Sequence, residues 1–200
     1  MPTESPTLGL GHLQFEALIT IARKSSNRND FALVVLLGLL GLRIFEACGS
    51  NIPDLGDEHG HRVLRVPSKG GKIVLVPLPP AVARAIDRAV DEHTSGPTLR
   101  NTLGVRTDRH ATTRRLKHLA AAAGSRMPRM HPHMLRHTFV TTMLDAGVGL
   151  RDVQIAARQP TREPPCAMTE PARTSTATPT TSSPPTWPPE HSQPLAPLPI

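Results

Sequence analysis

The sequence predicts a mainly α-helical domain with one small antiparallel β-hairpin or sheet. Residues 13–23 carry apolar side chains at helical spacing, and residues 32–42 form an apolar run typical of a buried helix. Two short runs rich in β-branched residues, HRVLRV and KIVLVPL, flank the turn PSKGG, whose glycines can supply the positive φ of a tight turn. The stretch before them, PDLGDEHG, is expected to be a polar loop.

Helices are expected before this hairpin. Asn29 or Asp30 can cap a helix that begins at Phe31, because short polar side chains accept hydrogen bonds from free N–H groups in a first turn. A short helical segment that carries Arg43 follows and ends near Gly49.

Four more helices are expected after the hairpin. Two prolines open a helix over residues 81–92, as proline in a first turn allows. Asp108 precedes a strongly basic helix over residues 109–124. The last two helices are expected over residues 133–146 and 150–158.

The composition divides the chain into a body and a tail. Residues 1–159 mix apolar runs and charges like a globular domain, whereas residues 160–200 hold roughly half of the prolines and are mostly Pro, Thr, Ser and Ala. We expect the tail to be disordered. Two cysteines are too few for a disulfide framework and no signal peptide is visible, so a reducing cytoplasm is expected. Residues 32–42 supply about half the length that a bilayer requires, and no membrane span is predicted.

The formal net charge of +7 favours a polyanionic partner such as DNA or RNA. The basic helix over residues 109–117 is a candidate to lie against a DNA backbone, although an ordinary solvated face explains it equally well. A basic protein from a GC-rich genome is the other explanation of the total charge.

The stretch HPHMLRHTF, residues 131–139, holds three histidines and an arginine. His133 and His137 are four residues apart and His131 lies just upstream, so zinc binding is one hypothesis. The spacing lacks the glutamate of HExxH, however, and no carboxylate or thiol is close in sequence. Alternatively, His133 and Arg136 share one helix face and could together bind a phosphate, since a guanidinium pairs with phosphate oxygens.

Three motifs resemble the tyrosine recombinases, the phage integrase family. GLRIFEA around Arg43, SKGGK after VLRV, and HPHMLRHTFVTTMLDAG around Arg136 occur in that family's order and near its intervals. The phrase LRDVQIAAR also matches. The resemblance implies an incomplete tyrosine-recombinase catalytic-domain fold and site-specific recombination of double-stranded DNA, through a 3′-phosphotyrosine and with other recombinase subunits as partners. It implies no metal or cofactor.

The resemblance also implies roles for individual residues. Arg43, Arg136, His133 and Lys69 match the positions that surround the scissile phosphate. The two arginines would offset charge that builds on the phosphate oxygens, and Lys69 would protonate the leaving 5′ oxygen, with Lys72 as a less favoured substitute. His133 would bond the phosphate or handle the proton of the nucleophile.

The chain contains no tyrosine, so the covalent nucleophile of the family is absent from it. The family's interval places Gln159 at the usual second histidine or tryptophan and Met168 at the usual tyrosine. Composition changes abruptly at Gln159, which suggests a frameshift: synonymous codons for residues 166–170 can be chosen that spell Arg-Tyr-Asp-Arg in another frame. We therefore expect a chain that is inactive alone, with a non-catalytic DNA-binding remnant or a partner of an intact recombinase as the alternative. The DNA-clamp domain that precedes the catalytic domain in relatives is also expected to be missing.

Overall fold

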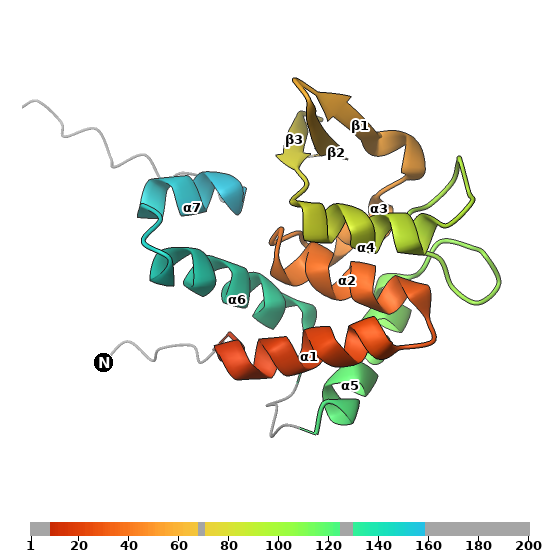
Figure 1. The fold of residues 1–200 in the computed structure, drawn as a ribbon, viewed down its shortest axis with the longest axis horizontal. Helices are drawn as coiled ribbons and strands as arrows, with labels where there is room; N and C mark the ends of the chain where they lie inside the picture. The colour runs from red at the N-terminus through yellow and green to blue at the C-terminus, as the bar shows by residue number, and fades with distance from the viewer. Residues whose placement is uncertain (1–8, 68–70, 125–129, 159–200) are drawn as a thin grey trace, which may run out of the picture. The chain divides into compact units, whose positions relative to one another are not determined.

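The computed structural model describes residues 9–67, 71–124 and 130–158 (Figure 1). Helices predominate, with a three-stranded antiparallel sheet in the order β1-β2-β3, which confirms the predicted fold class. The bounds are α1 (His12–Lys24), α2 (Arg28–Gly38), α3 (Ile44–Gly49), 3-10 helix η1 (Ile52–Asp54), β1 (Leu55–Glu58), β2 (His61–Pro67), β3 (Ile73–Pro77), α4 (Pro80–Val90), α5 (Arg109–Ala122), α6 (Pro132–Asp145) and α7 (Leu150–Ala156).

Helix α2 is the centre of the core, as its apolar sequence predicts. Its residues from Asp30 to Gly38 are all buried, and the helix contacts α1, α3, α4 and α6. The predicted start of this helix was wrong, because Asn27 caps it and accepts a hydrogen bond from the backbone N of Asn29. Asn29 instead donates from its side chain to the carbonyl of Arg100, which ties α2 to the loop before α5.

Asp30, the other predicted cap, forms a buried ion pair. Its carboxylate is 1% exposed and accepts a hydrogen bond of 2.8 Å from Nε of Arg115 on α5. The Ser25 hydroxyl also donates to Asp30. A buried carboxylate needs such partners, because removing an ionised group from water is costly unless other charges and donors replace the solvent.

The stretch PDLGDEHG is not only a loop, because it contains the edge strand β1. Leu55 pairs with Leu64 of β2, and Glu58 pairs with His61. His59 and Gly60 join these strands and both have positive φ, which fits a two-residue hairpin turn. The predicted hairpin is confirmed by the pairing of β2 with β3, in which Val63 lies opposite Pro77.

Several predicted features lie outside the described residues. Lys69 falls between the described residues 67 and 71, and Gln159, Met168 and the tail of residues 160–200 follow the last described residue, Arg158. Within the described part of the chain, we find no helix with the length and apolarity that a membrane crossing needs.

Candidate active site

Arg43 lies at the start of α3, where Glu46 holds it. The backbone N of Arg43 donates to Oε2 of Glu46 at 2.8 Å, and its Nη1 donates to Oε1 at 2.9 Å. The Glu46 side chain is 1% exposed, whereas that of Arg43 is 36% exposed. The acid thus satisfies the first turn of the helix and fixes the guanidinium, while part of Arg43 still faces solvent.

Arg136 approaches the same place from α6. It is 5% exposed, and its two terminal nitrogens donate to the carbonyls of Gly41 and Ala157. Gly41 has a φ of +58°, and this bend lets its carbonyl accept from α6 just before the chain enters α3. The fold therefore brings together two arginines that lie far apart in the sequence.

Burial lowers the pKa of Arg136 to about 10, and repulsion from two neighbouring arginines adds to the shift, while Glu46 opposes it. Arg136 still carries its charge at neutral pH. An excess of positive charge is thus held in a site from which water is largely excluded, and such a site favours an anion.

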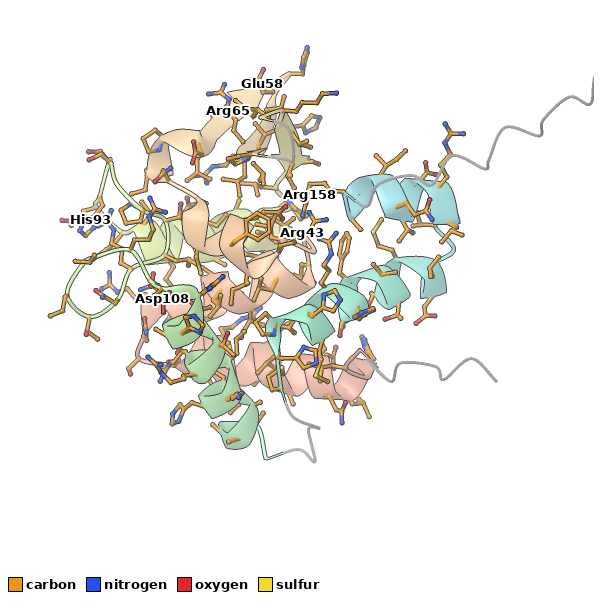
Figure 2. The ribbon with its side chains drawn as sticks, turned by 180° about the vertical axis from the view of Figure 1, so that it is seen from behind. Arg43, Glu58, Arg65, His93, Asp108 and Arg158 are labelled. Atoms are coloured by element: carbon orange, nitrogen blue, oxygen red, sulfur yellow. The ribbon has the colours of Figure 1, made fainter. Side chains whose placement is uncertain are left out.

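The second neighbouring arginine is Arg158, whose role the sequence analysis missed. Its Nη2 donates to the carbonyl of Gly41 at 3.0 Å and to Oε2 of Glu46 at 3.3 Å. Its own carbonyl accepts from Nη2 of Arg43 at 3.2 Å, and Figure 2 shows the two residues side by side at the end of α7. No signal in the sequence marks this residue, because an arginine at a helix end is ordinarily solvated.

His133 lies one helical turn before Arg136 on α6 and remains exposed. Its pKa is lowered by partial desolvation, then by the charges of His137, Arg136, His131 and Arg43. The rings of His133 and His137 meet edge to face, with centroids 4.5 Å apart. His133 is therefore near the arginines and mostly neutral at pH 7, a state in which one ring nitrogen can accept a proton.

The zinc hypothesis finds no support in the residues that the structure describes. His131, His133 and His137 all lie in that part of the chain, yet no cluster of three or more metal-binding side chains is arranged there to hold an ion.

Of the two candidate lysines, Lys69 falls outside the described residues. Lys72 is exposed and directly precedes β3.

The basic helix α5 has one side packed against the core and another side exposed to solvent. Arg115 turns inward to the buried Asp30, and burial of Leu116 and Leu119 fixes the same side to the core. Arg109, Arg114 and Lys117 are exposed on the other side. Only this exposed side can meet a polyanion.

The chain is similar to proteins of known family. Residues 10–157 match the model of the phage integrase family. The chain is 32% identical over 165 residues to the tyrosine recombinase XerD of Vibrio cholerae, covering 78% of this chain and 54% of that protein. It is 35% identical over 133 residues to the tyrosine recombinase XerC of Corynebacterium efficiens, covering 64% of this chain and 41% of the relative.

Solved structures show the same fold. A crystal structure of XerA recombinase is 26% identical with a TM-score of 0.63, covering 74% of this chain and 54% of that chain. A XerH site-specific recombinase bound to its difH substrate is 21% identical with a TM-score of 0.67, covering 80% of this chain and 50% of that chain. The chain thus spans about half the length of the relatives it matches. Its motifs, its fold and the match of residues 10–157 show that the chain belongs to the phage integrase family.

Proposed function

We propose that this chain binds double-stranded DNA through Arg43 and Arg136, as the phosphate-binding part of a site-specific tyrosine recombinase. The convergence of Arg43 and Arg136 carries the proposal. The Arg43 guanidinium donates to Glu46 and the Arg136 guanidinium donates to the Gly41 carbonyl, and Arg158 bonds both of these acceptors.

The chemistry of strand cleavage explains why such a pair is useful. When an oxygen nucleophile attacks phosphorus, negative charge builds on the non-bridging oxygens, and fixed guanidiniums stabilise that charge without a metal. Glu46 fixes Arg43 before the substrate arrives, so little reorganisation is needed. In this proposal Lys69 is the general acid, and His133 accepts a proton or bonds the phosphate.

The covalent step needs a tyrosine, which this chain does not contain. We therefore propose that the chain alone forms no covalent adduct with nicked recombination-site DNA. A denaturing gel tests this, and an adduct that survives denaturant would contradict it. A cytoplasmic location belongs to the same proposal, because it follows from the DNA partner.

DNA binding itself is tested with Arg43→Ala. Loss of one charge-assisted phosphate contact should weaken the binding of a short duplex by about tenfold at low salt and reduce the salt dependence by about one counterion. Arg84→Ala is the matched control, since it removes the same charge from an exposed position on α4. An equal effect of the two variants would show that binding depends only on net charge.

A second candidate function is supply of this phosphate site to an intact recombinase subunit that provides the tyrosine. The bonds that Glu46 makes to Arg43 favour it, because that half of the site is preorganised within this chain. Mixing the chain with an intact relative separates the two functions. Cleavage that appears only in the mixture, and is lost with Arg43→Ala, would establish complementation.

A further inference from the structure

The end of α7 is docked against the two site arginines. The carbonyl of Ala157 accepts a hydrogen bond from Nη2 of Arg136, and the carbonyl of Arg158 accepts one from Nη2 of Arg43 at 3.2 Å. Carbonyl oxygens at the C-terminal end of a helix carry partial negative charge. They therefore meet the guanidiniums as phosphate oxygens would.

The side chain of Arg158 fastens this end of the helix in place. It is 5% exposed, and its Nη2 donates both to the Gly41 carbonyl and to Glu46. These are the acceptors that also hold Arg136 and Arg43. One buried guanidinium thus links α7 to the anchors of both site arginines.

Docking the end of α7 against the site is energetically unfavourable for Arg158 itself. Arg158 follows the last turn of α7 with a φ of +51°, a position where glycine is the preferred residue. Its buried Nε has no hydrogen-bond partner among the described residues. Two guanidiniums, those of Arg43 and Arg158, also share the Glu46 carboxylate, and repulsion from Arg43 adds to the burial that lowers the pKa of Arg158. Because the arrangement is strained, an entering anion can displace it.

We propose that Arg158 is a positioning residue that latches the end of α7 over Arg43 and Arg136, so that a DNA phosphate must displace the Ala157 and Arg158 carbonyls to reach the guanidiniums. This inference rests on the proposed DNA-binding function and gives its site an autoinhibitory contact. The alternative is that Arg158 is a third phosphate-binding cation. The two hypotheses predict opposite effects when Arg158 is removed.

The Arg158→Gly variant distinguishes the latch from a third phosphate-binding cation. Glycine suits the positive φ and removes the side chain that fastens the helix end, so the arginines become available more often. We expect a short duplex to bind about three- to tenfold more tightly at low salt, although the protein has lost a positive charge. Inorganic phosphate should compete with the duplex at a correspondingly lower concentration.

Two further variants serve as controls. Arg151→Ala removes the same charge from an exposed position on α7 and should weaken binding slightly. Arg158→Lys keeps the charge without the planar fork, so its affinity should lie between those of the parent and Arg158→Gly. Thermal melting of each variant checks the fold. A merely structural role of Arg158 would lower the melting temperature without raising affinity.

Unchanged or weaker binding by folded Arg158→Gly would overturn the latch. If Arg43→Ala weakens binding as expected in the same series, the proposed function stands and the latch alone fails. If neither the parent chain nor Arg158→Gly binds the duplex, both proposals fail. Tighter binding by Arg158→Gly that Arg43→Ala abolishes would support both.

Discussion

The carboxylate of Glu46 accepts two hydrogen bonds from Arg43, one from its backbone N at 2.8 Å and one from Nη1 at 2.9 Å. The acid is buried beneath the arginine and also reaches Arg158. It therefore both caps α3 and supplies the negative charge that holds Arg43 and Arg158 in place.

Glu46→Gln should destabilise the protein by about 3 kcal/mol, because it leaves buried guanidiniums without their counter-charge. Chemical denaturation measures the loss. Glu58→Gln is the control, since Glu58 pairs with Arg65 at a more exposed position and its replacement should cost less than about 1 kcal/mol. Similar losses in the two variants would show that the burial of Glu46 does not matter.

Asp30→Asn should cost about 3 kcal/mol of folding stability by the same reasoning, since Arg115 then loses the charge that it pairs with on α2. Asp87→Asn breaks the exposed pair with Arg62 and should cost under about 1 kcal/mol. A small effect of Asp30→Asn would mean that the buried pair contributes little.

Gly41→Ala should destabilise the protein by about 3 kcal/mol. Its φ is positive, and the added Cβ would collide with the Phe139 ring of α6. Gly60→Ala isolates the backbone part of this cost: its φ is also positive, but open space surrounds it, so about 1 kcal/mol is expected. Equal losses would show that the contact between Gly41 and Phe139 does not constrain the packing of α6.

His133 should titrate below its ordinary pKa of 6.5, as partial desolvation and neighbouring cations require. Because the folded-state pKa is lower than the unfolded one, protonation favours unfolding. The contribution of His133 to stability is complete above pH about 6.5 and is lost as pH falls from there toward the folded-state pKa.

Histidine NMR titration measures this midpoint. His137→Gln removes the neighbour whose charge lowers the pKa of His133 most and should raise the midpoint, whereas His118→Gln, on the separate helix α5, should not. An unchanged midpoint in His137→Gln would contradict the electrostatic explanation.

The coding DNA offers a test of the frameshift hypothesis. Read from the Arg158 codon to the stop in the other frames, it should encode a histidine and then Arg-Tyr near the position of Met168. If no frame restores a tyrosine, the Pro/Thr-rich sequence is genuine, and the role of partner to an intact recombinase becomes the function to pursue.

The sequence by itself determined the helices and the hairpin of β2 and β3, and its motifs marked Arg43 and Arg136 as candidate site residues. Apolar periodicity marks buried faces, and the motifs around Arg43 and Arg136 are local in the chain. The sequence did not identify Asn27 as the N-cap of α2. Asn27, Asn29 and Asp30 can each cap a helix, and only packing selects among them. The sequence also missed β1, whose polar residues form a strand because β2 offers a free edge.

Only the tertiary structure decided which charges meet. Glu46 lies in α3, Arg136 in α6 and Arg158 just after α7, and no spacing in the sequence relates them. Arg115 likewise belongs to a basic helix that suggests DNA binding, yet it faces Asp30 in the interior. The physical reason is that buried charges must find partners, and those partners are set by how the helices pack.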